Sequence, residues 1–242
     1  MTSGASNRRL ENTLAELARA QRWVLGSLVA VNVLFPALLF VGAWPEPWRG
    51  FAGEESPINW LSTLQCALIA VIAFALWCLT EIGRRAGTEP LQRRWPWLMF
   101  SAGFLAMAAD ERFRGHELIR EKFLKPRGVL TDVDFLLPGD VALIAYVAVG
   151  LVLSWFLLDE LRQIRASLVL FVAAIVLIGI SAVQDSLDLG FFHNRGFRHF
   201  QTIAEELAEV WAQLLFAASF LLLLFHKLRC LLWGLASVST GK

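Results

Sequence analysis

Six long apolar runs, joined by shorter polar segments, dominate the pattern of hydrophobic and polar positions along the chain. A helix of about 20 apolar residues is long enough to cross the hydrocarbon core of a bilayer, so we interpret each run as one membrane span. The predicted spans are Trp23–Trp44, Pro57–Thr80, Trp95–Asp110, Pro138–Leu158, Ala166–Leu187 and Ile203–Leu228. This pattern predicts an all-α integral membrane bundle of six transmembrane helices.

The first 22 residues differ from these runs because they are polar and rich in arginine. Within them, Leu10, Leu14 and Leu17 recur at helical spacing and would form one apolar stripe. We expect an amphipathic helix on the membrane surface at residues 1–22. It would be followed by the membrane domain at residues 23–232 and a short tail at residues 233–242.

The composition agrees with a membrane location, since 57% of the residues are hydrophobic and the mean hydropathy is +0.56. A formal net charge of +1 leaves no basic excess for a phosphate backbone, so nucleic acid is not an expected partner. Cys66 and Cys78 would lie about 18 Å apart along one helix. That separation is too large for a disulfide bond.

The loops on the side that holds both termini carry most of the lysine and arginine, whereas most of the acidic residues lie on the other side. Basic residues keep the loops of a membrane protein in the cytoplasm. We therefore expect both termini to be cytoplasmic, in the inner membrane of a bacterium. The acidic side would face the periplasm.

Ionisable and amide side chains gather where five of the predicted spans meet this outer surface. Charged groups at such a depth are costly unless they have a partner or a function. Clustered carboxylates also repel one another, so either some are protonated or cations offset them. The group comprises Glu54, Glu55, Asn59, Ser62, Gln65, Asp110, Glu111, His116, Glu117, Asp140, Gln184, Asp185, Asp188, His199, Glu205, Glu206 and Glu209.

Helical spacing relates some members of this group, because residues seven apart return to nearly the same face. Asp110 and Glu117 share a face if the third helix continues past the membrane surface. His199 and Glu206 share a face of the last helix. Ser62 and Gln65 fit helix–helix contacts better than chemistry.

The leading interpretation is a metal-dependent membrane hydrolase that acts on a lipid or lipid-linked substrate. In this hypothesis a divalent metal ion, with zinc expected, lowers the pKa of a bound water. The predicted metal ligands are His116, His199, Glu206 and Glu209. Asp110 or Glu117 would accept the proton of the water as general base.

Further residues would complete this predicted site. Glu55, Asn59 and Asp185 would orient the ligands or the substrate. Arg112 and Arg114 could meet an anionic head group, and Gln184 is assigned to the substrate as well.

Two other interpretations use the same residues. In the first, a non-enzymatic protein takes up a cation or relays protons for transport or sensing. In the second, the carboxylates form a network of salt bridges and hydrogen bonds that merely ties helix ends together. A third interpretation is a structural partner subunit, which would use the exposed helix faces and leave the site empty. The oligomeric state is not predicted by either pattern.

Three motifs together resemble a pattern of uncharacterised bacterial multi-spanning membrane proteins. They are Glu55-Ser-Pro-Ile-Asn59-Trp-Leu, Asp110-Glu111 followed by His116-Glu117, and Glu205-Glu206-x-x-Glu209. More faintly, the placement of acidic, Asn, Ser and His residues resembles the membrane hydrolase superfamily of alkaline ceramidases and progestin and adiponectin receptors. That resemblance implies a zinc amidase with seven spans and three zinc-binding histidines. This chain has six predicted spans, and glutamates stand where the last histidine pair would be.

Overall fold

The computed structural model describes residues 3–51, 56–87, 94–113, 115–119, 122–123, 125–127, 140–186 and 195–240. This part of the chain contains helices and no strand, so the predicted all-α class is confirmed. The long helices are α1 (Ser3–Gly42), α2 (Pro57–Arg85), α3 (Trp95–Phe113), α5 (Asp140–Leu161), α6 (Arg165–Ser186) and α7 (Arg195–Thr240). The short ones are η1 (Pro47–Gly50), α4 (Gly115–Ile119) and η3 (Lys125–Arg127).

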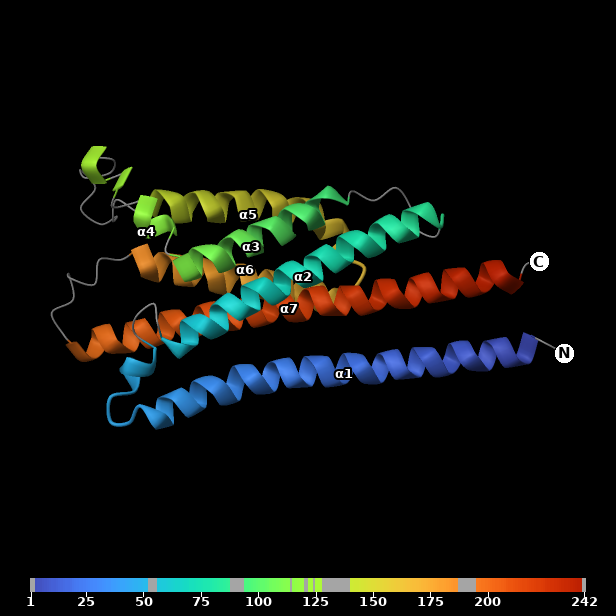
Figure 1. Ribbon diagram of the computed structural model, residues 1–242, viewed down its shortest axis with the longest axis horizontal. Coiled ribbons are helices and arrows are strands. Elements are labelled where there is room, and N and C mark those ends of the chain that lie inside the picture. Colours follow the sequence, from blue (N-terminus) through green and yellow to red (C-terminus); the bar gives the residue numbers. More distant parts are fainter. Residues whose placement is uncertain are drawn as a thin grey trace.

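The long helices lie side by side and alternate in direction, with both termini at the same end of the bundle (Figure 1). We call this the terminal end and the opposite one the distal end. Helix α7 packs on α1, α2 and α6, while α2 packs on α3, α3 on α5, and α5 on α6. Helices α2, α3, α5, α6 and α7 therefore close into a ring, and α1 leans on α7 from outside.

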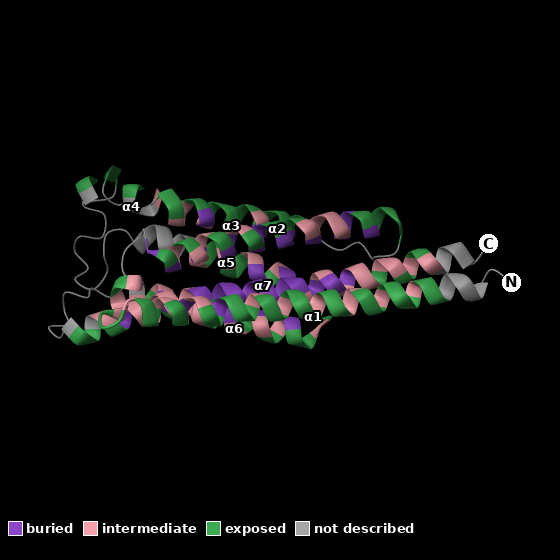
Figure 2. Cartoon of the chain, turned by 60° about the horizontal axis from the view of Figure 1, so that its bottom comes forward, coloured by how far each residue is buried: buried purple, intermediate pink, exposed green. Residues whose placement is uncertain are grey.

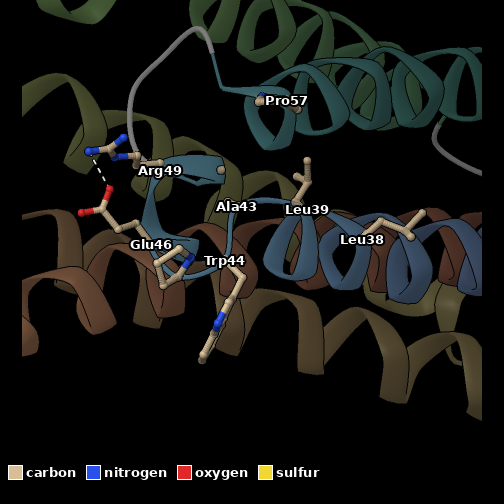
Figure 3. Close-up of a pocket in the computed structure, with 10 residues that line it drawn as sticks. Leu38, Leu39, Ala43, Trp44, Glu46, Arg49 and Pro57 are labelled. Carbon is tan, nitrogen blue, oxygen red and sulfur yellow. Dashed lines mark ion pairs between the residues drawn. The ribbon is translucent and has the colours of Figure 1, made fainter.

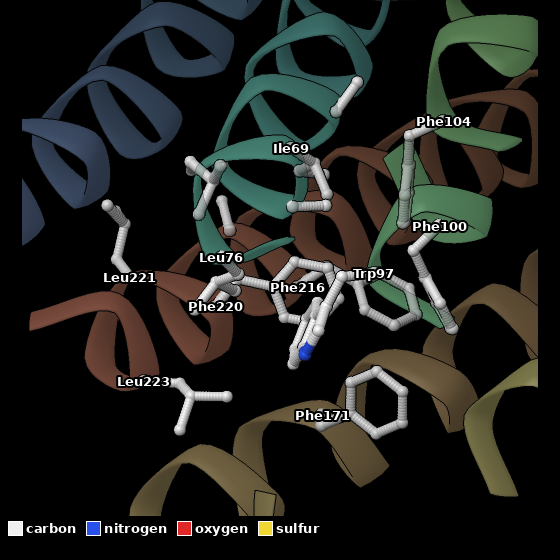
Figure 4. Packing of buried hydrophobic residues seen from close by; sticks show 14 of the residues in the cluster. Ile69, Leu76, Trp97, Phe100, Phe104, Phe171, Phe216, Phe220, Leu221 and Leu223 are labelled. Carbon is white, nitrogen blue, oxygen red and sulfur yellow. The ribbon is translucent and has the colours of Figure 1, made fainter. Parts of the chain in front are cut away.

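Aromatic side chains fill the interior of this ring (Figure 4). Phe104 of α3 and Phe216 of α7 lie 5.4 Å apart between ring centroids, and Trp97 and Phe220 lie 5.1 Å apart. Phe171 of α6 completes the cluster from the other side, 5.4 Å from Phe216. Edge-to-face contacts of this kind are favoured by the quadrupoles of the rings. The buried charged and amide side chains of the ring lie toward its two ends, on either side of this cluster.

Four of the described helices are long and apolar enough to cross a membrane. They cover Arg8–Gly42, Pro57–Arg85, Arg165–Gln184 and His199–Ala236, which correspond to the first, second, fifth and sixth predicted spans. Helices α3 and α5 correspond to the third and fourth predictions but are not among these four. Membrane spans are thus supported, and the full count of six remains a prediction.

Helix α1 does not end at residue 22, where a separate surface helix was expected to stop. Leu17, from the predicted apolar stripe, packs against the main hydrophobic core, and the Arg229 guanidinium of α7 donates a hydrogen bond to Oε1 of Gln21. The junction between the polar segment and the apolar run, at Arg22 and Trp23, holds neither Gly nor Pro. Nothing there interrupts the helix, which therefore continues into the apolar run. Likewise, α7 continues through the predicted tail to Thr240.

Candidate functional site

One face of α7 carries polar groups at both ends and aromatic rings between them. Glu209, Gln213, Phe216, Phe220 and Lys227 all lie within about 60° of one another around the helix axis, at roughly 100° per residue. Glu209 and Lys227 are separated by about 27 Å along the axis, close to the ~30 Å thickness of a hydrocarbon core. This face of α7 therefore connects two polar regions at opposite ends of the ring.

The first polar region links α1, α2 and α7 through four buried side chains, Asn32, Ser62, Gln65 and Gln213, which we call the amide site. The Gln213 side-chain amide donates to Oγ of Ser62 at 2.6 Å. The Gln65 amide donates to Oδ1 of Asn32, whose own amide nitrogen donates to the Leu28 carbonyl at 2.9 Å. Each side chain is at most 3% exposed, so the helices hold these amides away from solvent.

The amide site has acceptors without donors. The Oε1 atoms of Gln65 and Gln213 have no hydrogen-bond partner among the described residues, and the same holds for Oε1 of Gln184. A buried acceptor left unpaired costs about 1–3 kcal/mol, and most buried polar groups in proteins are paired. The two oxygens of the amide site are therefore acceptors that a donor or a cation could satisfy.

Carboxylates lie beside this site. Oε1 of Glu209 accepts a hydrogen bond from Oγ of Ser181 on α6 at 3.1 Å. The carboxylates of Glu111 on α3 and Glu209 on α7 lie close enough to the buried thiol of Cys66 to interact with it electrostatically. Cys66 directly follows Gln65 on α2. Helices α3 and α7 thus bring negative charge to the level of the amides.

Asp110, the predicted general base, faces the start of α4. Its Oδ1 atom lies 2.8 Å from where a Cβ at position 115 would stand, so only glycine fits there without a shift. Helix α3 ends at Phe113 and α4 begins at Gly115. Residue 114 and the side chain of Glu117 lie outside the described ones, so the shared face of Asp110 and Glu117 stays a prediction. Glycine at the restart lets the chain approach the carboxylate closely.

The predicted metal ligands are only partly described. The ring of His199 stacks on Trp48 of η1, with centroids 4.3 Å apart and an interplanar angle of 14°. Among the side chains that the structure places, no three His, Cys, Asp or Glu are grouped so as to hold a metal ion. The side chains of His116 and Glu117 lie outside the described set. Metal binding by them with Glu206 and Glu209 stays a prediction.

The residues assigned to the substrate have other contacts. The Asn59 backbone N–H donates to Oγ of Ser56 at 3.4 Å, an N-cap of α2, and its Oδ1 accepts from Oγ1 of Thr63 at 3.5 Å. The Arg112 guanidinium lies over the Trp60 ring, 4.4 Å from its centroid. The Gln184 backbone carbonyl accepts from Gln201 at 3.4 Å. The side chains of Glu55, Arg114 and Asp185 lie outside the described ones.

The second polar region, at the terminal end, was not identified from the sequence. Lys227 Nζ lies 3.3 Å from Oε2 of Glu160, and the same oxygen accepts a hydrogen bond from Trp97 Nε1 at 2.8 Å. All three residues are buried. The sequence pattern placed Glu160 and Lys227 with the solvent-facing loop charges. The sequence signal that could have identified Lys227 is the helical periodicity of α7, because Lys227 lies five turns from Glu209 on the same face.

Asn32 and Gln213 were also missed, although each is an amide within an apolar run. A surface hollow of about 500 Å³ lies elsewhere, at the distal end of α1 (Figure 3). Its walls come from the last turn of α1, from η1 and from Pro57, with the Glu46–Arg49 ion pair at its edge. Among the described residues, none of the predicted site residues lines this hollow.

Comparison with curated proteins and with solved structures finds no match. A family model matches residues 27–224, which covers α2, α3, α5 and α6 completely, most of α7 and the C-terminal part of α1. The amide site and the Glu160 carboxylate both lie inside this range. The chain belongs to the family described as Domain of unknown function (DUF8692).

Proposed function

We propose that this protein is a six-span membrane protein that binds a small cation, or a small hydrogen-bond donor such as ammonium, at the amide site. The observation that carries the proposal is the pair of buried oxygens of Gln65 and Gln213, to which none of the described residues donates. Neutral amide oxygens suit hard cations and N–H donors. The nearby Glu111 and Glu209 supply negative charge that favours a cationic occupant.

Six spans are supported by the alternation of the long helices. Helices α3 and α5 run beside α2 and α6 and complete the ring, and an even number of crossings returns both termini to one side. Arginines at the terminal end, including Arg84, Arg85 and Arg94, support a cytoplasmic location for that end. The amide site would then lie in the outer half of the bilayer.

A transport or sensing role fits this arrangement better than hydrolysis. The aromatic cluster separates the amide site from the Glu160–Lys227 pair, so an occupant would reach one polar region at a time. Metal-dependent hydrolysis of a lipid remains a prediction, and no contact of the described residues favours it over binding. The hydrolase hypothesis is tested by the zinc content of the purified protein.

The binding experiment uses purified protein in detergent and in liposomes. Thermal unfolding is followed in NaCl, KCl and NH₄Cl against choline chloride at constant ionic strength. An occupant that binds only the folded protein raises the midpoint by mass action. Uptake of radioactive sodium and rubidium, and of protons with an entrapped dye, then tests transport.

The test variant is Ser62→Ala with Gln213→Leu, which removes both partners of one hydrogen bond. The matched control is Ser167→Ala with Ser219→Ala, since these two serines also join α7 to a neighbour but satisfy each other at 2.8–3.0 Å. We expect the cation response to vanish in the first variant and persist in the control. A wild type indifferent to every cation, or an equal loss in both variants, would overturn the proposal.

A further inference from the structure

Three arginines converge on one buried carboxylate at the terminal end. Arg84 donates to both oxygens of Glu81, through Nε at 3.1 Å and Nη2 at 2.9 Å. Arg85 Nε donates to Oε1 at 2.7 Å, and Arg94 donates to Oε2 from just before α3. Each carboxylate oxygen thus accepts two hydrogen bonds, which uses its lone pairs. Glu81 fixes the position of all three guanidinium groups.

This cluster keeps an excess of positive charge and of donors. One carboxylate faces three guanidinium groups, and Glu89 and Arg93 in the connecting segment cancel each other in charge. A guanidinium has five N–H donors, and the contacts to Glu81 use at most two from each arginine. The arginine side chains are 42%, 74% and 45% exposed, whereas Glu81 is 10% exposed. The remaining donors are therefore accessible.

The surroundings place the cluster at the boundary of a bilayer. Ile82, beside Glu81, and Trp95, beside Arg94, are both exposed. Tryptophan is typical of the level of the lipid head groups, and the Trp95 ring packs on Phe156 of α5 at 5.0 Å. Lipid phosphates lie at the same level, so an acyl chain could follow the apolar surface beside Ile82 while the phosphate meets the arginines.

We infer that Arg84, Arg85 and Arg94, held in place by Glu81, bind the phosphate group of an anionic phospholipid in the leaflet at the terminal end. Arginine matches phosphate oxygens through two parallel N–H bonds. Pre-positioned guanidinium groups lose less freedom when they bind. Glu81 is a positioning residue in this site. The inference is independent of the amide site and its occupant.

The experiment measures binding of phosphatidylglycerol to the full chain in neutral detergent by native mass spectrometry, with phosphatidylcholine as the zwitterionic comparison. We expect a clear preference for phosphatidylglycerol. Arg84→Gln with Arg94→Gln should weaken this binding by about fivefold for each arginine removed. Arg85→Gln alone, which leaves Glu81 two partners, should weaken it by about fivefold. Thermal unfolding of each variant checks that it is folded.

The matched control is Arg162→Gln with Arg165→Gln, which removes the same charge from the same end, where Arg162 contacts Asp159 at 3.3 Å. Its affinity should stay near that of the wild type. Glu81→Gln separates a built site from a merely basic surface, because it adds positive charge but releases the arginines. A built site predicts weaker binding, whereas a basic surface predicts stronger binding and would overturn the inference. Displacement of the lipid by equimolar inorganic phosphate would show a soluble ligand and overturn the lipid assignment.

Discussion

The two polar regions on the inner face of α7 are equally buried, but they differ in whether the described residues satisfy their polar groups. At the terminal end, the charges of Glu160 and Lys227 oppose each other, and Trp97 supplies a further donor. At the amide site, Gln65 and Gln213 each keep an acceptor without a donor. In the Glu160–Lys227 region the protein itself supplies the partners, whereas the amide site keeps acceptors that the described residues do not satisfy. We therefore propose a structural role for the Glu160–Lys227 region and a binding role for the amide site.

The same contrast appears between the two longest helices. In the most apolar stretch of α1 only 11% of the residues are buried, against 61% in α7 (Figure 2). Both helices are apolar, but α7 is surrounded by protein and α1 has one protein-facing stripe. The polar residue of α1 that enters the interior is Asn32, which is 1% exposed. Helix α1 thus contributes to the amide site through one side chain.

The largest effect is expected from breaking the satisfied region. Lys227→Met leaves the Glu160 carboxylate buried without its cation, which should lower the free energy of unfolding by about 3–5 kcal/mol. Glu160→Gln with Lys227→Met removes both charges and should recover most of that loss. The measurement is unfolding in detergent micelles. If the double variant is as unstable as the single one, the pair is not an isolated unit.

A smaller effect is expected from stranding a partner inside the amide site. Gln65→Leu removes the donor to Asn32 Oδ1 and leaves that oxygen buried and unpaired, at a cost of about 1–3 kcal/mol. Asn32→Leu with Gln65→Leu removes both groups and should restore the stability. Equal unfolding free energies for the single and double variants would show that another donor reaches Asn32.

His199 distinguishes a packing role from a metal-binding role. His199→Ala removes the stack on Trp48, worth about 1 kcal/mol, while His199→Phe keeps an aromatic ring and should keep the stability. Elemental analysis of the purified proteins gives the second measurement. Zinc bound at one ion per chain in the wild type and lost in His199→Phe would support the predicted metal site and contradict a purely packing role.

The sequence predicted the parts of this molecule that depend on local pattern. Apolar runs of sufficient length gave α2, α3, α5, α6 and the apolar parts of α1 and α7, since length and hydropathy are properties of each run alone. The Asp110–Glu117 relation assumes that a helix continues past residue 113. Helix α3 ends at Phe113 and α4 begins at Gly115, while residue 114 and the Glu117 side chain lie outside the described residues, so this relation stays a prediction. Periodicity alone cannot locate the end of a helix unless the turn chemistry is read as well.

The contacts between runs were harder to predict. Gln65 was interpreted as a helix–helix contact, and it does donate to Asn32 of another helix. Whether its Oε1 atom finds a donor depends on side chains of other helices, which the sequence pattern does not place. Glu160 and Lys227 lie near predicted span ends, so hydropathy alone predicted that they are exposed to solvent. Their burial follows from α5 and α7 facing each other across the ring, which no single helix encodes.

The smallest change in stability, and the sharpest test of the comparison, is expected from Ser62→Ala with Gln213→Leu. This variant removes a hydrogen bond of 2.6 Å together with both of its partners, so no group is left stranded and the change should be nearly neutral. It also removes the unpaired oxygen of Gln213, which should stabilise the empty protein slightly, as is common when a binding site is filled with apolar groups. An unfolding midpoint equal to or above that of the wild type in choline chloride, combined with loss of the response to sodium, potassium or ammonium, would establish that Gln213 serves binding rather than folding. A fall of several kcal/mol in the free energy of unfolding would instead show that these side chains hold the helices together, and would contradict the binding role of the amide site.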